Sequence, residues 1–182
     1  MQKTVTVPFM LLGILFNICL VASNLLETKV VQVGGITATA GLIVFPISYI
    51  INDCIAEVWG FKKARLIIWS GFASNFLVIA FAQLAVLLPA APFWEGEEGF
   101  NFVFGMAPRI AVASLIAFLA FAGLIPAGEL LIMIGTQAVL KSLYEVIILP
   151  VTIRVVKYIK KVDGNDVYDL GTSYNILKVK DI

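Results

Sequence analysis

The chain has 182 residues, of which 60% are hydrophobic and only 14% are charged, and its mean hydropathy is +0.99. A soluble domain carries about a quarter charged residues, so this composition argues against a water-soluble globule and equally against a disordered chain. The formal net charge of +1 offers no basic face to nucleic acid. We therefore expect an all-α integral membrane protein.

Five stretches are long and apolar enough for membrane-spanning helices, which need roughly 20 apolar residues each. In chain order they are 4–26, 30–52, 66–94, 110–128 and 130–153. The first has too long an apolar core for a signal peptide, so we expect a retained span. Pro46 is expected to kink the second span. The prediction is one transmembrane helical domain at 1–161, a bundle of about five helices, followed by a polar cytoplasmic tail at 162–182.

The distribution of charge predicts the orientation of these spans. Lys62, Lys63 and Arg65 form a basic turn that we expect in the cytoplasm. The glutamates at 95–98 lie in a loop without basic residues, which we expect outside. The basic residues at 154–161 then put the C-terminus in the cytoplasm, and counting back puts the N-terminus there too.

This orientation needs an odd number of crossings between residues 98 and 154, whereas the sequence offers two. Three explanations are open. One segment is re-entrant, the charge rule fails once, or a span is absent from this chain.

Asp53 and Glu57 lie four residues apart, so both carboxylates project from one helical face. They can be acceptors for the N–H groups or the positive charge of a solute. They can equally be hydrated at the membrane surface or paired with the basic turn that follows. The spacing favours neither interpretation.

Lys141 and Glu145 repeat this spacing deep in the last span, where a charge costs roughly 3 kcal/mol. They either pair with each other along the helix or line a pathway, and their depth favours the pathway. Tyr144 lies beside them, and Gln137 lies one turn earlier on the same face.

Three further residues have two interpretations each. Arg109 either extends to the lipid headgroups or binds a carboxylate of another helix. Asn24 either joins helices through its amide or binds the edge of a heterocycle. Trp69 either lies in the interfacial aromatic belt or stacks on a flat ligand.

The residue types in this sequence exclude most kinds of catalytic site. The sequence contains no histidine, which excludes histidine-based acid–base catalysis and histidine-ligated metals. Cys19 and Cys54 form neither a disulfide framework nor a metal-binding pair. No nucleotide-binding or protease motif is present, so we expect no enzyme, no catalytic residue, no metal and no cofactor.

Several runs of the sequence together resemble one family, the queuosine precursor transporters, also called the vitamin-uptake-like family. The runs are SNLLETK at 23–29, FPISY at 45–49, DCIAEVWG at 53–60, LLPAAPFW at 87–94, GMAPR at 105–109 and KSLYE at 141–145. The DCIAEVWG and KSLYE runs are specific to the family when they occur together. The resemblance covers residues 23–161.

The resemblance implies a multi-pass inner-membrane protein of six spans with both termini in the cytoplasm. It implies import of a small deazapurine base, 7-cyano- or 7-aminomethyl-7-deazaguanine. Asp53 or Glu57 would then accept the N–H groups of the base, and Glu145 would balance a substrate amine. Trp59, Trp69 or Tyr144 would stack on the ring.

In the same interpretation Lys141 and Arg109 would keep acidic groups ionised, and Glu57 or Glu145 could carry a coupling proton. Asn24 and Gln137 complete the predicted substrate-binding set.

Family members carry a further stretch near Phe118–Phe121 that this sequence lacks. One span and a loop amount to roughly 40 residues, which would supply the missing crossing. The alternative function is a non-transporting membrane subunit that binds a solute for a partner complex or stabilises that complex. Both the transporter and the non-transporting subunit are compatible with a homo-oligomer.

Overall fold

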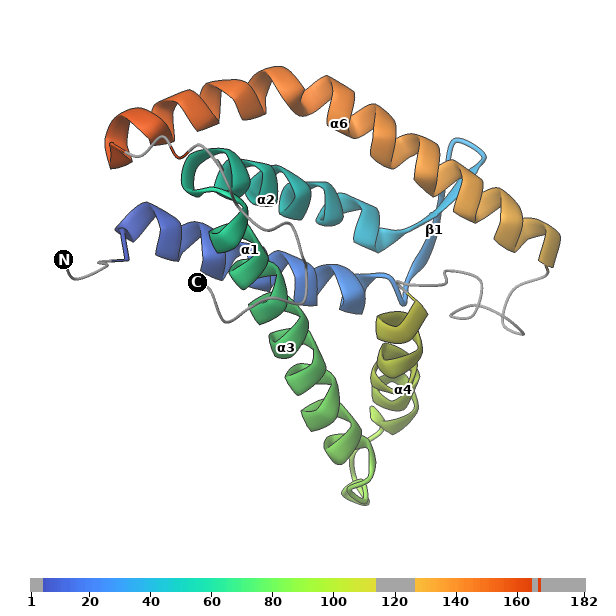
Figure 1. Cartoon of the computed structure of the whole chain (residues 1–182). Helices are drawn as coiled ribbons and strands as arrows, with labels where there is room; N and C mark the ends of the chain where they lie inside the picture. Colours follow the sequence, from blue (N-terminus) through green and yellow to red (C-terminus); the bar gives the residue numbers. More distant parts are fainter. Residues whose placement is uncertain (1–4, 114–126, 165–166, 168–182) are drawn as a thin grey trace.

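The structure is a computed structural model that describes residues 5–113, 127–164 and 167 (Figure 1). Within these residues the chain is mainly helical, as the sequence predicts. The elements are α1 (Val7–Leu26), β1 (Val30–Val33), β2 (Ile36–Thr39), the 3-10 turn η1 (Ala40–Ile43), α2 (Phe45–Trp59), α3 (Phe61–Val86), α4 (Glu97–Ala113) and α6 (Ala127–Asp163).

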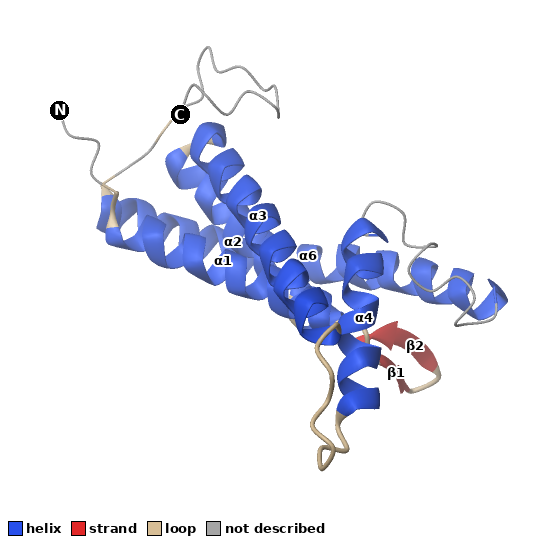
Figure 2. Ribbon diagram, turned by 90° about the horizontal axis from the view of Figure 1, so that it is seen from below, coloured by secondary structure: helices blue, strands red, loops and turns tan. Residues whose placement is uncertain are grey.

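The helices form two groups. α1, α2 and α6 lie side by side in one layer, and α2 packs against both of the others (Figure 1). α3 packs on α1 and α2 and then leaves this layer with α4 as a helical hairpin. The strands β1 and β2 lie at the opposite end of the layer from the α2–α3 junction, beside the first half of α6 (Figure 2).

The expected second span, 30–52, is not one helix. Its first part forms the antiparallel hairpin β1–β2, in register from Val30 opposite Thr39 to Val33 opposite Ile36. Gly34 and Gly35 have φ values of +58° and +81°, which a tight two-residue turn requires and other residues rarely adopt. β-Branched residues on both sides of this turn favour strands. Apolar composition alone therefore misled the sequence prediction.

Pro46 does not kink a helix, in contrast to the prediction. It lies in the first turn of α2, where the absence of its N–H removes no helical hydrogen bond. Gly60, with φ +85°, ends α2 and is followed directly by α3. The basic residues at 62–65 therefore belong to the first turns of α3 rather than to a loop.

The later spans also differ in their boundaries. α4 begins at Glu97, so Arg109 lies inside this helix, after Pro108, and not at the start of a span. Its first-turn glutamates are favoured by the helix dipole. The rest of the expected fourth span and the predicted missing stretch at Phe118–Phe121 lie outside the described residues. α6 is longer than 130–153 and extends two residues into the expected tail.

The core joins α1, α2, α3 and α6. Its buried members include Phe16, Ile55, Val58, Ile67 and Ile159. Two of the described helices, α1 and α3, are long and apolar enough to cross a membrane. Only 28% and 17% of their most apolar windows are buried, so most of this apolar surface faces outward.

Candidate functional site

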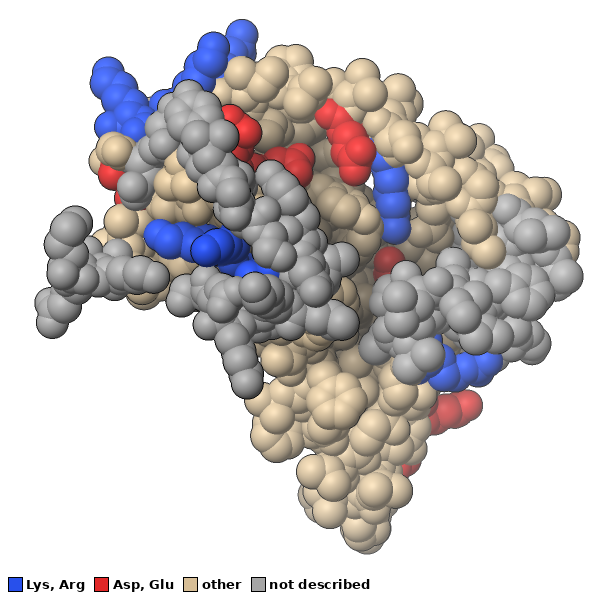
Figure 3. Space-filling view, in the orientation of Figure 1, with Lys and Arg blue, Asp and Glu red and all other residues tan. Residues whose placement is uncertain are grey.

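Charged side chains gather along the furrow between α6 and the helices beneath it (Figure 3). The negative charges of Asp53 on α2 and Glu145 on α6 repel each other across this furrow. At the end of α1, Glu27 interacts with Lys141 in the middle of α6. The structure thus brings together charges from three helices that are far apart in the sequence.

Two adjoining clefts follow the contact between α2 and α6. One has a volume of about 250 Å³ and is lined by Tyr49, Asp53, Tyr144 and Glu145, among others. The second, of about 540 Å³, extends toward the ends of both helices. Asp53, Leu149 and Thr152 line both, so we describe them as one α2–α6 groove. Asp53 therefore lies at its centre.

Glu57 lines the larger cleft and forms an ion pair with Lys160 of α6, with a distance of 2.9 Å between Oε1 and Nζ. The expected partners in the basic segment at 62–65 do not form this pair. The Glu57 side chain is 63% exposed and that of Lys160 is 23% exposed. This pair joins α2 to α6 at one end of the groove.

Lys141 does not pair with Glu145 along the helix. Its Nζ lies 3.8 Å from the centroid of the Phe45 ring at the start of α2. Phe45 in turn packs edge-on against Tyr49, with centroids 4.8 Å apart and an interplanar angle of 90°. Burial raises the pKa of the Glu27 carboxyl, and the positive charge of Lys141 partly opposes that shift.

Gln137 extends the polar stripe of α6 toward the hairpin. The Thr39 hydroxyl of β2 donates a hydrogen bond of 3.3 Å to Gln137 Oε1. The hairpin that the sequence prediction missed therefore contributes a polar contact next to the groove.

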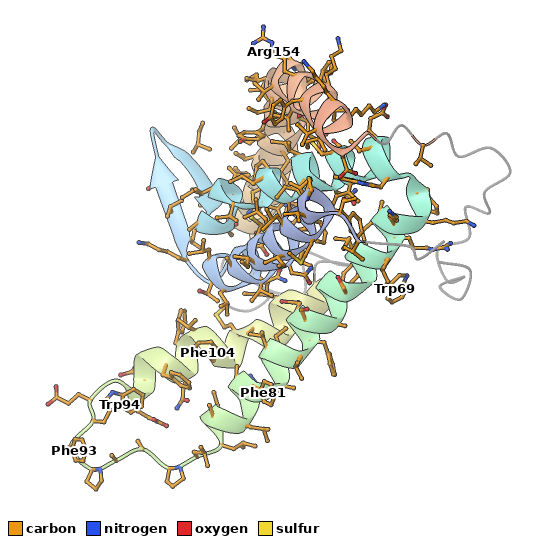
Figure 4. All side chains as sticks on the ribbon, turned by 90° about the vertical axis from the view of Figure 1, so that its left-hand side faces the viewer. Trp69, Phe81, Phe93, Trp94, Phe104 and Arg154 are labelled. Atoms are coloured by element: carbon orange, nitrogen blue, oxygen red, sulfur yellow. The ribbon has the colours of Figure 1, made fainter. Side chains whose placement is uncertain are left out.

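Other predicted residues lie outside this cluster. Trp69 lies on α3, half-exposed, and packs on Phe72 with ring centroids 6.2 Å apart. Figure 4 shows it on the outer side of α3, apart from α6. Trp59 is buried in the core. Arg109 is exposed on α4, which packs on α3 and α1.

Asn24 is buried in α1 one turn before Glu27. Like Gln137, it lies beside the charged cluster and does not belong to the lining of either cleft.

Three members of the cluster were not predicted, namely Glu27, Phe45 and Tyr49. All three lie in runs that carry the family resemblance, and Phe45, Tyr49 and Asp53 follow each other at four-residue intervals. That spacing places one face of α2 toward the groove, and it could have indicated the two aromatic residues.

The arrangement has a definite chemistry. Asp53 and Glu145 accept hydrogen bonds, Tyr49 and Tyr144 offer flat apolar faces, and Lys141 supplies a positive charge. Within the residues that the structure describes, no three carboxylate or thiol groups converge as a metal site would require.

Comparison with known proteins shows to which class of protein this chain is similar. The family described as "Putative vitamin uptake transporter" matches residues 39–124. This region includes Asp53 and Glu57, whereas Lys141 and Glu145 lie beyond it. No solved structure matches the chain.

A relative from Bacillus subtilis (strain 168) carries the name "Probable queuosine precursor transporter". It is 35% identical over 101 residues, which cover 54% of this chain and 43% of the relative. The match thus spans less than half of that protein's length. Both comparisons confirm the resemblance that the sequence motifs indicated.

Proposed function

We propose that this chain is a multi-pass inner-membrane protein that imports a 7-deazaguanine precursor of queuosine. The outward-facing apolar surface of α1 and α3 supports a lipid environment. The 26 residues of α3 span about 39 Å, enough to cross a hydrocarbon core of about 30 Å.

The observation that carries the proposal is the α2–α6 groove. It places Asp53, Glu145 and two tyrosines around one cleft in an otherwise apolar helical protein. Drug-sized ligands occupy pockets of roughly 300–1,000 Å³, so clefts of about 250 and 540 Å³ suit a single bicyclic base.

The groove residues have distinct roles in this proposal. Asp53 accepts the adjacent N–H groups of the guanine-like edge as charge-assisted hydrogen bonds. Tyr49 and Tyr144 contact the faces of the ring, and Glu145 adds a second negative charge to the groove. Glu57 and Lys160 pair at the end of the groove, where alternating access requires a closure.

The same contacts support the proposed orientation. The ion pair of Glu57 with Lys160 joins the basic end of α6 to the end of α2, which directly precedes the basic start of α3 (Figure 1). These positive segments then face the cytoplasm together, and both termini lie on that side.

The test uses a bacterium that cannot make the deazaguanine base but can insert it into tRNA. The chain is expressed, the base is supplied at limiting concentration, and queuosine in tRNA is measured. We expect wild type to restore queuosine and Asp53→Asn to reduce restoration at least tenfold. Glu98→Gln, an exposed acid on α4, is the matched control and should behave as wild type.

No restoration by a well-expressed wild-type chain would contradict transport of this base. Binding of the base by the purified chain, without uptake into liposomes, would instead favour the alternative of a non-transporting subunit.

A further inference from the structure

We propose that Phe45 and Glu27 form a cation seat for an alkylammonium group on the transported base, and that Lys141 occupies this seat in the empty chain. The inference rests on the proposed function and specifies its substrate class. It predicts selection of a flat heterocycle with a primary amine over the same ring with an uncharged substituent.

The geometry of Lys141 is that of a bound cation. Its Nζ lies 3.8 Å from the centroid of the Phe45 ring, well within the distance at which a ring face attracts an ammonium group. Glu27, at the end of α1, adds a negative charge near the same ammonium group, although within the described residues no direct ion pair joins the two side chains. Ring, carboxylate and ammonium come from α2, the end of α1 and α6, so no local helical contact produces this arrangement.

The seat adjoins the groove at Tyr49. This residue packs edge-on against Phe45 and also lines the 250 Å³ cleft with Asp53 and Glu145. A base held by Asp53 would therefore have its ring in the cleft and a short amine-bearing substituent directed toward Phe45.

Lys141 has a second partner available when a substrate takes the seat. Glu145 lies one helical turn further along α6, the distance at which lysine and glutamate side chains meet. Within the described residues, the Glu145 carboxylate forms no hydrogen bond or ion pair. Lys141 can thus leave Phe45 and have its charge balanced by Glu145. The seat then exchanges the ammonium group of Lys141 for that of the substrate.

The experiment measures equilibrium binding to the purified full chain in lipid nanodiscs. The probes are 7-aminomethyl- and 7-cyano-7-deazaguanine, which share a ring and differ in the charge of one substituent. We expect Phe45→Leu to weaken binding of the aminomethyl base about tenfold and that of the cyano base less than twofold. Phe72→Leu, an exposed ring on α3, is the matched control.

Two further variants test the seat if Phe45→Leu is poorly folded. Phe45→Tyr keeps an aromatic face and should retain the preference for the charged base. Lys141→Met removes the competing ammonium group and should strengthen binding of the aminomethyl base several-fold relative to the cyano base.

The outcomes separate this inference from the proposed function. Equal weakening of both bases by Phe45→Leu, or loss of aminomethyl binding in Lys141→Met, would overturn the seat alone. Failure of wild type to bind either base would overturn the seat together with the proposed function.

Discussion

The indole Nε1 of Trp59, the last residue of α2, donates a hydrogen bond of 2.6 Å to Oδ2 of Asp163, the last residue of α6. Trp59 is buried, and its ring packs edge-on against Phe9 of α1 with centroids 5.4 Å apart. The Glu57–Lys160 ion pair lies beside this bond. Together they join the ends of α2 and α6 at one end of the α2–α6 groove.

The Trp59–Asp163 bond should stabilise the fold measurably. Trp59→Phe keeps an aromatic ring in the core but removes the donor, and a hydrogen bond to a charged group contributes about 1.5–3 kcal/mol. We expect a lower melting temperature of the purified protein in detergent. Trp94→Phe, in the exposed loop before α4, should leave the melting temperature nearly unchanged, and equal losses in both variants would contradict this role of the bond.

The Glu57–Lys160 pair should contribute little to stability. Because the Glu57 side chain is 63% exposed, solvent screens the interaction, and exposed pairs are worth about 0–1 kcal/mol. Glu57→Gln should therefore leave the melting temperature close to that of wild type while altering queuosine restoration. A large loss of stability with unchanged import would show that the pair is structural and not a closure of the groove.

Gly71 should be indispensable for the packing of α3 on α1. A Cβ atom at this position would lie 2.8 Å from Phe16 Cε1 and 2.9 Å from Leu20 Cδ2. Small residues allow such close approach of helices in membranes. We expect Gly71→Ala to lower stability by about 1–3 kcal/mol, the usual cost of overpacking.

Gly105 on α4 is the matched control for this substitution, because a Cβ atom there would meet nothing within 4 Å. Gly105→Ala should raise stability by up to about 1 kcal/mol, since alanine is the better helix former. Thermal unfolding of both variants in one detergent decides the comparison, and similar losses in the two would refute the packing argument.

The proposed orientation can be checked by cysteine labelling in intact cells. Cys19 and Cys54 are buried, so background labelling by an impermeant thiol reagent should be low. Glu95→Cys should be labelled from outside, whereas Lys62→Cys should require permeabilised membranes. Labelling of both positions from the same side would reject the assignment of α3 as a complete crossing.

Much of the helical architecture could be predicted because its signals are local. Long apolar runs predicted α1 and α3, and charges inside such runs drew attention to Asp53, Glu57, Lys141 and Glu145. The hairpin β1–β2 was missed because an apolar run of Val, Ile and Thr has the same composition in a strand as in a helix. Two consecutive glycines, Gly34 and Gly35, were the local signal for the turn.

The sequence by itself determined the apolar character of this chain, the spacing of its acidic pairs and the motifs of its family resemblance, because each depends on residues that are neighbours along the chain. Only the tertiary structure decided which charges meet. Lys141 lies over Phe45 rather than against Glu145, and Glu57 pairs with Lys160 from a helix about a hundred residues further on. Such contacts depend on how α1, α2 and α6 pack, and packing joins side chains without regard to their separation in sequence.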